Sequence, residues 1–135
     1  MQPISTNLQD SVELYLSCRK LKDLDFIGKS DPQVKVFIQN QGHWVPLGQT
    51  ERILDNLNPD FKTTIKVDYM FETKQPLRFE VYDVDVHTEN DLIGTVESSV
   101  GEIMGARKQT VTLDLQHKSK KSTGKLIIRG IRVLK

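Results

Sequence analysis

Cysteine, histidine and long apolar runs are scarce in this sequence. Cys18 is its only cysteine, which excludes an intrachain disulfide framework, and three isolated histidines leave zinc without a ligand set. No apolar run approaches the roughly 18 residues of a membrane span, and the first residues lack the charged and apolar regions of a signal peptide. The chain also has no Asn-x-Ser/Thr sequence. These absences favour a cytosolic protein that meets a membrane only from outside.

Net charge is nearly absent as well. The chain has 19 Lys and Arg against 18 Asp and Glu, for a formal charge of +1. This balance argues against a nucleic-acid-binding protein that works through an overall basic charge. With 135 residues, of which 37% are hydrophobic and 27% charged, the composition is that of one globular domain with a single core. We expect a monomeric domain over 1–135, with its core at about 12–134 and a loose leader at 1–10.

Apolar and polar residues alternate with a period of two along much of the chain. Val12, Leu14 and Leu16 fall on one face of such a segment, and Glu13 and Tyr15 on the other. Because successive side chains of a strand point to opposite faces, this pattern predicts half-buried antiparallel strands. About eight segments show this alternation or an apolar run: 12–18, 33–39, 44–52, 61–72, 77–82, 92–97, 111–115 and 125–134.

Helix is predicted at one place only. The sequence Ser99-Val100-Gly101-Glu102 fits a capping box, so one or two helical turns should follow Ser99 and end at Gly105. With turn signals between most of the strands, the fold class is all-β. We predict a two-sheet antiparallel sandwich of eight strands.

Acidic residues gather in two connections between the predicted strands. They are Asp23, Asp25 and Asp31 in the first connection, and Asp83, Asp85, Glu89 and Asp91 in the fifth. Both groups lie where strands end, so several carboxylates could converge at one end of the fold and repel one another. Calcium takes six to eight oxygen ligands in a flexible geometry and would remove this repulsion. The alternative is a pair of solvated acidic turns, because Asp is a common turn residue.

Other chemistries fit the sequence less well. The segment 83–88 fails the EF-hand pattern, which needs an oxygen ligand at its fifth position and Gly at its sixth. Magnesium would need fewer carboxylates and a phosphate partner. Gly28-Lys29-Ser30 imitates the end of a phosphate-binding loop, but Asp23 stands where that loop requires Gly. No nucleophile motif or paired His and Cys residues occur, so we predict that the chain is not an enzyme.

Four short motifs resemble the signature of C2 domains in their order and spacing. They are LDFIGKSDP at 24–32, NPDF at 58–61, VYDVD at 81–85 and DLIG at 91–94. The segments 48–52, 68–80 and 100–103 resemble the first C2 domain of copines in particular, and the resemblance extends from about Val12 to Leu134. Because the first good strand directly precedes the first loop, the chain resembles the permuted C2 topology, in which the extra strand is C-terminal.

The resemblance also implies a domain context and a calcium site. Copines carry a second C2 domain and a von Willebrand A-like domain, so the chain would be a domain excised from a larger copine. The third loop is shorter than in many copines and closer to synaptotagmin-type C2 domains. C2 domains bind calcium through two Asp of the first loop and three of the third. The implied ligands are Asp25, Asp31, Asp83, Asp85 and Asp91, the main chain of Leu24 and Glu89, and, as a further candidate, the hydroxyl of Thr88.

Apolar residues flank the expected calcium site. Phe26 and Ile27 occupy the tip of the first loop, and Val86 and His87 that of the third. Exposed apolar tips beside a cation suit a module that binds membranes when calcium is present, and burying Phe26 and Ile27 could contribute about 1.5–3 kcal/mol each. The alternative is that these side chains pack against neighbouring loops.

A lysine-rich segment lies between the last two strands, at 117–125. Strand ends alternate in an antiparallel fold, so this connection should lie at the calcium end. Lys118, Lys120 and Lys121 would then face an anionic membrane, unless the hairpin is simply solvated and mobile. We therefore predict a cytoplasmic, calcium-dependent phospholipid-binding module that is recruited to membranes when calcium rises. The alternative function is a calcium-independent, protein-binding C2 domain, with partners that the sequence does not identify.

Overall fold

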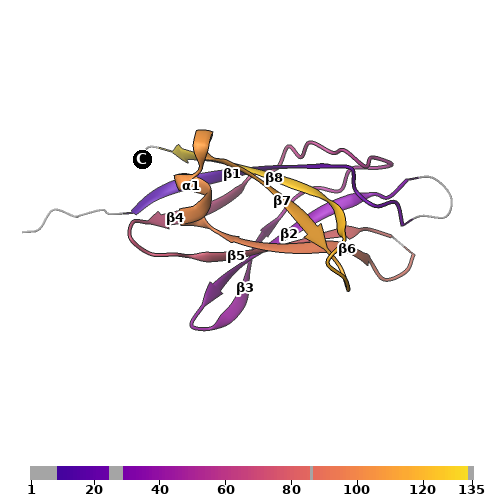
Figure 1. The fold of residues 1–135 in the computed structure, drawn as a ribbon, viewed down its shortest axis with the longest axis horizontal. Helices are drawn as coiled ribbons and strands as arrows, with labels where there is room; N and C mark the ends of the chain where they lie inside the picture. Colours follow the sequence, from indigo (N-terminus) through magenta and orange to yellow (C-terminus); the bar gives the residue numbers. More distant parts are fainter. Residues whose placement is uncertain (1–8, 25–28, 86, 134–135) are drawn as a thin grey trace, which may run out of the picture.

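The computed structural model describes residues 9–24, 29–85 and 87–133 (Figure 1). Within this part of the chain, eight strands account for most of the residues, and the only helices are one short α-helix and one 3-10 turn. In chain order they are β1 (Gln9–Arg19), β2 (Pro32–Asn40), β3 (His43–Gln49), β4 (Ile65–Met70), β5 (Pro76–Asp83), β6 (Asp91–Ser99), α1 (Val100–Gly105), η1 (Arg107–Gln109), β7 (Thr110–Gln116) and β8 (Ser122–Val133).

The eight described strands form one antiparallel sheet in the order β3-β2-β5-β6-β7-β8-β1-β4. The prediction of two separate sheets is corrected by this order, because Thr95 of β6 pairs with Gln116 of β7 and so joins the two halves. The edge strands β3 and β4 contact each other, so the sheet curls into a nearly closed barrel (Figure 1). The prediction of an all-β fold with eight antiparallel strands is confirmed.

The junction of the two halves depends on a position without a side chain. A Cβ atom at Gly94 of β6 would lie 2.8 Å from the Cβ atom of Leu115 and would also meet the hydroxyl of Thr123. Real Cβ atoms essentially never come this close to another atom. Glycine at this position therefore lets β6 lie directly on β7 and the start of β8.

The C-terminal strand lies where the permuted topology places it. β8 pairs with β1 along its length, from Ser11 with Val133 to Arg19 with Lys125, and this confirms the predicted neighbour. The leader expected at 1–10 is shorter than predicted, because Gln9 already pairs with Met70 of β4. Residues 1–8 lie outside the described part of the chain.

The strand expected over 61–72 is also shorter than predicted. β4 begins only at Ile65. Before it, the backbone N–H groups of Lys62 and Thr63 donate hydrogen bonds to the carboxylate of Glu51, at 2.6 and 3.1 Å. A side chain thus satisfies backbone donors that a neighbouring strand would otherwise bind.

The core lies inside the curled sheet and follows the period of two. Val12, Leu14 and Leu16 are buried, whereas Tyr15 between them is 37% exposed. Cys18 continues the buried face, and burial raises the pKa of its thiol to about 12, so it remains neutral. The core thus agrees with the alternation in the sequence.

The short helix α1 covers one end of the core. Its first turn is capped as predicted, because the Ser99 hydroxyl accepts a hydrogen bond from the Glu102 N–H at 3.0 Å. The carboxylate of Glu102 accepts a hydrogen bond from the Ser98 hydroxyl at 2.6 Å, where a full capping box would bind the N–H of the cap residue. Val100 and Ile103 are completely buried and attach the helix to the sheet.

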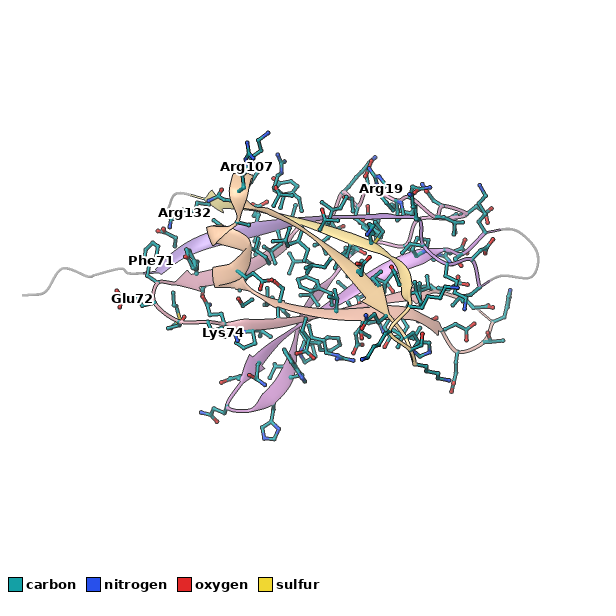
Figure 2. All side chains as sticks on the ribbon, viewed as in Figure 1. Arg19, Phe71, Glu72, Lys74, Arg107 and Arg132 are labelled. Carbon is teal, nitrogen blue, oxygen red and sulfur yellow. The ribbon has the colours of Figure 1, made fainter. Side chains whose placement is uncertain are left out.

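The two ends of the barrel differ. We call the end formed by the described residues of the β1–β2, β5–β6 and β7–β8 connections the loop end; it lies at the right of Figure 1. The opposite end carries α1 and the β4–β5 connection, with Phe71, Glu72 and Lys74 (Figure 2). The antiparallel order therefore brings loops that are far apart in the sequence to one end of the domain.

Candidate functional site

Three of the predicted calcium ligands come together at the loop end. Asp31 directly precedes β2, Asp83 is the last residue of β5, and Asp91 is the first of β6. In the sheet Asp83 pairs with Pro32 on one side and with Asp91 on the other. The Asp31 N–H donates a hydrogen bond to Oδ1 of Asp83 at 2.9 Å. Strand register thus places three carboxylates on neighbouring strands.

Asp83 is the most buried of these carboxylates, with 4% of its surface exposed. No Lys, Arg or His side chain of the described residues forms an ion pair with Asp31, Asp83 or Asp91. A buried carboxylate without a cationic partner is costly, and neighbouring carboxylates add mutual repulsion. The donor set, all oxygen and all anionic, fits a hard divalent cation such as calcium.

Asp85 is exposed and organises the described part of the β5–β6 connection. Its Oδ1 accepts a hydrogen bond from the His87 N–H at 2.8 Å, and its own N–H donates to Oδ1 of Asn90 at 3.1 Å. Hydrogen bonds from the His87 N–H and the Thr88 hydroxyl lower the pKa of Asp85. The carboxylate is therefore ionised at neutral pH. Thr88 and Glu89 are both exposed in the same connection.

Asp31 is linked to a third connection that the sequence analysis did not include in the site. Its Oδ1 accepts a hydrogen bond from the Asp55 N–H at 2.8 Å. Asp55 in turn accepts one from the Lys29 N–H at 3.2 Å, and the buried hydroxyl of Ser30 accepts one from the Leu24 N–H at 2.9 Å. Asp55 and Ser30 thus position the first loop. The parity rule that was applied to the β7–β8 connection also assigns the β3–β4 connection to this end, and could have identified Asp55.

The described residues contain no group of three or more His, Cys, Asp or Glu side chains arranged to hold a metal ion. In this structure Asp31, Asp83 and Asp85 accept hydrogen bonds from backbone N–H groups. Four of the predicted site residues lie outside the described part of the chain: Asp25, Phe26, Ile27 and Val86. The complete set of calcium ligands therefore stays a prediction.

The lysine-rich β7–β8 hairpin lies at the loop end and contacts the β1–β2 connection. The Lys22 N–H donates a hydrogen bond to the carbonyl oxygen of Thr123 at 2.9 Å. Lys118, Lys120 and Lys121 are exposed on this hairpin. Three segments of the chain, at 20–24, 83–91 and 117–123, thus meet around one end of the barrel.

Comparison with known proteins identifies the family, because the C2 domain family matches residues 12–122. The chain belongs to the C2 domain family. It is 42% identical to copine-A of Dictyostelium discoideum over 118 residues, which are 87% of this chain and 20% of copine-A. It is 38% identical to copine-B of the same organism over 129 residues, 89% of this chain and 24% of copine-B. This C2 domain thus spans about a fifth to a quarter of the length of these copines.

Solved structures agree with the C2 fold. The first C2 domain, domain A, of plant extended synaptotagmin 1 superposes with a TM-score of 0.76 at 22% identity, covering 99% of this chain and 98% of that one. The calcium-bound pair of C2 domains, A and B, of extended synaptotagmin 2 gives a TM-score of 0.69 at 22% identity, covering 93% of this chain and 46% of that one. At these identities the likeness shows the fold alone. Within the described residues, no helix has the length and apolar character needed to cross a membrane.

Proposed function

We propose that this C2 domain binds anionic phospholipid membranes in a calcium-dependent manner, as a cytoplasmic module recruited when calcium rises. The observation that carries the proposal is the meeting of Asp31, Asp83 and Asp91 on neighbouring strands with no cationic partner in the described chain. The proposed calcium ligands are Asp25, Asp31, Asp83, Asp85, Asp91, the main-chain oxygens of Leu24 and Glu89, and the Thr88 hydroxyl.

Each carboxylate has a distinct part in this proposal. Asp83 supplies the buried oxygen at the base of the site, held by the Asp31 N–H. Asp85 is already ionised and exposed, so calcium does not have to displace a proton from it. Calcium, when bound, would offset the repulsion among the carboxylates and offer open positions to lipid phosphate oxygens.

The membrane contact is proposed for residues around the same end. Phe26, Ile27, Val86 and His87 would enter the interface, and Lys118, Lys120 and Lys121 would face anionic headgroups. Each lysine near an anionic surface contributes about 1 kcal/mol, and this attraction decays within about a Debye length. The calcium-bound state of extended synaptotagmin 2, a protein of the same fold, supports the calcium part of the proposal.

Isothermal titration calorimetry with calcium, with and without anionic liposomes, tests this function. The parent domain should release or absorb heat on calcium addition, and the double variant Asp83→Asn with Asp85→Asn should not, because two anionic ligands are lost. The amide oxygen of the first substitution can still accept the hydrogen bond from the Asp31 N–H. The fold should therefore survive, and the apo form should become more stable as repulsion falls.

A matched control removes two charges elsewhere. Asp68→Asn with Glu72→Gln changes the net charge equally, in β4 and in the β4–β5 connection, so calcium binding should match that of the parent. Equal binding by the Asp83 and Asp85 double variant would mean that the site is misassigned. A parent domain that binds no calcium, even with liposomes, would instead favour the alternative of a calcium-independent protein-binding C2 domain.

A further inference from the structure

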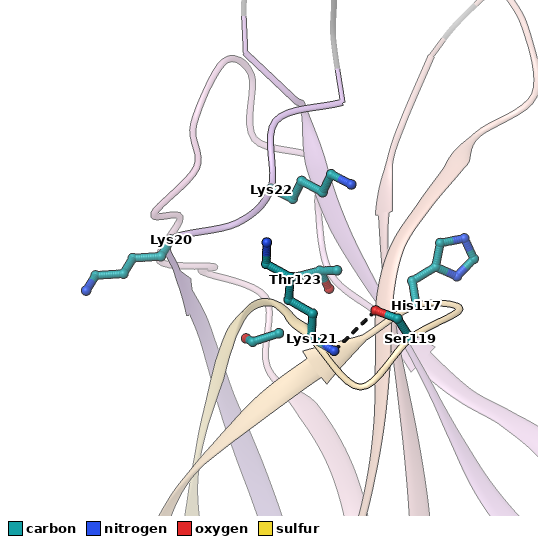
Figure 3. A pocket seen from close by; sticks show the side chains of 7 residues that line it. Lys20, Lys22, His117, Ser119, Lys121 and Thr123 are labelled. Atoms are coloured by element: carbon teal, nitrogen blue, oxygen red, sulfur yellow. Dashed lines mark hydrogen bonds between the residues drawn. The ribbon is translucent and has the colours of Figure 1, made fainter.

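A cavity of about 320 Å³ lies at the loop end, between the β1–β2 connection and the β7–β8 hairpin (Figure 3). It is separate from the carboxylates described above, because no acidic side chain lines it. Its lining residues are Lys20, Lys22, His117, Ser119, Lys121, Ser122 and Thr123. The two walls come from segments that lie about a hundred residues apart in the chain, so the cavity exists only in the folded domain.

The walls of the cavity are fixed to each other. The hydrogen bond from the Lys22 N–H to the Thr123 carbonyl oxygen joins them at 2.9 Å. Gly124 follows with φ +141°, and a Cβ atom there would lie 2.8 Å from Cδ2 and 2.9 Å from Cα of Leu21, which is itself buried. Within the hairpin, the Lys121 N–H donates to the Ser119 hydroxyl at 3.2 Å. These backbone contacts form the cavity without a ligand.

Positive charge in this cavity is not neutralised by the described residues. None of the ion pairs found among them involves Lys20, Lys22 or Lys121. In contrast, Lys125 of the neighbouring strand contacts Asp114 at 2.8 Å. Figure 3 shows the Lys121 side chain extending toward the β1–β2 connection, while the Lys20 side chain turns away from the cavity. Lys22 and Lys121 are thus the two cations best placed to share one anion.

A phosphomonoester matches this set of donors. It carries a charge of about −1.5 to −2 at neutral pH and three strong acceptor oxygens. The ammonium groups of Lys22 and Lys121 can neutralise both charges. The Ser119 oxygen accepts its hydrogen bond from the Lys121 N–H, so its own hydrogen is available to a ligand. A lipid phosphodiester carries only a single charge and lacks a terminal oxygen set to enter a recessed cavity.

We propose that the cavity between Lys22 and Lys121 is a binding site for a phosphomonoester group, either on a lipid headgroup or on a small soluble molecule. The site does not need calcium, since none of its lining residues is a proposed calcium ligand. It therefore goes beyond the proposed function and can be tested independently of it. The lipid source would add a choice of headgroup to a surface otherwise selected by charge alone.

The first experiment uses the parent domain and inorganic phosphate in calcium-free buffer. Phosphate should shift the amide NMR signals of Lys22, Ser119 and Thr123, and sodium chloride at equal ionic strength should not. The double variant Lys22→Gln with Lys121→Gln should bind phosphate about tenfold more weakly, because two charge-assisted contacts are lost. The same measurement on the Asp83 and Asp85 double variant should show unchanged phosphate binding, which separates this proposal from the calcium site.

Two charge-matched variants distinguish a cavity from a diffuse basic surface. Lys118→Gln with Lys120→Gln removes two charges from the same hairpin but none from the cavity lining, so phosphate binding in solution should persist. Lys74→Gln with Lys108→Gln removes two charges at the opposite end and should also leave it unchanged. Equal weakening in all three double variants, or no phosphate-induced shifts in the parent, would overturn the proposal.

Vesicles then identify the source of the phosphomonoester. Phosphatidylcholine vesicles containing phosphatidic acid carry this group, and vesicles containing phosphatidylserine at matched surface charge do not. Stronger calcium-free binding of the parent to the phosphatidic acid vesicles, lost in Lys22→Gln with Lys121→Gln, would identify a lipid. Phosphate binding in solution without this preference would identify a soluble phosphate compound. A preference that survives the double variant would overturn the site.

Discussion

Gly124 is the residue on which the contact between the β7–β8 hairpin and the end of β1 depends. Its φ of +141° lies in a region that other residues rarely adopt, and its Cα lies directly against Leu21. The strained backbone and the close contact act in the same direction, because any Cβ at this position both requires an unusual conformation and pushes against a buried side chain. Gly94 has a comparable steric role where β6 meets β7.

Replacement of Gly124 should therefore destabilise the domain. We expect Gly124→Ala to lower the free energy of unfolding by about 1–3 kcal/mol, measured by urea denaturation at constant slope. Gly105→Ala is the matched control, because no atom lies within 4 Å of a Cβ built at that position and its φ is not positive. This control should change stability by less than about 0.5 kcal/mol. Equal stability of the two variants would contradict the steric argument.

The β3–β4 connection shows how one side chain can take the place of a strand partner. Glu51 accepts hydrogen bonds from the N–H groups of Lys62 and Thr63, at 2.6 and 3.1 Å. Burial opposes its charge, but these hydrogen bonds outweigh that effect and lower the pKa of Glu51 below its ordinary value of 4.5. The ionised carboxylate thus stabilises the approach of the chain to β4.

This contribution should depend on pH in a defined direction. Since the pKa is lower in the folded state, the stabilisation is present above pH 4.5 and is lost as pH falls through the folded-state value. We expect Glu51→Gln to cost about 1 kcal/mol at neutral pH, with the difference from the parent shrinking below pH 4.5. Urea denaturation across this pH range measures it. Glu72→Gln, on the exposed β4–β5 connection, should show no such trend, and a constant difference for Glu51→Gln would refute the assignment.

At the scale of the whole molecule, the domain has two chemically different ends. The loop end combines the carboxylates of Asp31, Asp83 and Asp91 with the lysine-rich hairpin. At the other end, Met70 and Phe71 are exposed, and the guanidinium of Arg132 stacks on the Phe71 ring at 4.8 Å (Figure 2). Both ends thus carry apolar groups, but only the loop end has acidic groups that a cation could bridge to a membrane.

The proposed membrane orientation predicts which apolar residues matter. Phe26→Ala with Ile27→Ala should weaken calcium-dependent liposome binding by about tenfold or more, because each buried side chain contributes about 1.5–3 kcal/mol. Calcium binding in solution, measured by calorimetry, should stay nearly unchanged. Met70→Ala with Phe71→Ala removes apolar surface at the opposite end and should leave liposome binding intact. Equal liposome affinity of the Phe26 and Ile27 variant and the parent would argue against docking through the first loop.

Local patterns in the sequence were sufficient for much of the fold. The alternation around Val12, Leu14 and Leu16 predicted the buried faces, since a strand side chain's direction depends only on its position in the strand. The cap at Ser99 predicted the start of α1 for the same local reason. Strand parity assigned the lysine-rich connection to the end where Lys22 meets Thr123. The resemblance to C2 domains named a ligand set of which Asp31, Asp83 and Asp91 are neighbours in the sheet.

Only the tertiary structure decided how distant segments meet. Joining all strands in one sheet depends on Gly94, whose missing side chain has no periodic signal. The contribution of Asp55 to the first loop, and the cavity between Lys22 and Lys121, depend on register and on the close approach at Gly124. A sequence pattern reports which face a residue occupies, because that is set by its neighbours in the chain. The distance between two faces is set by packing, which no single segment encodes.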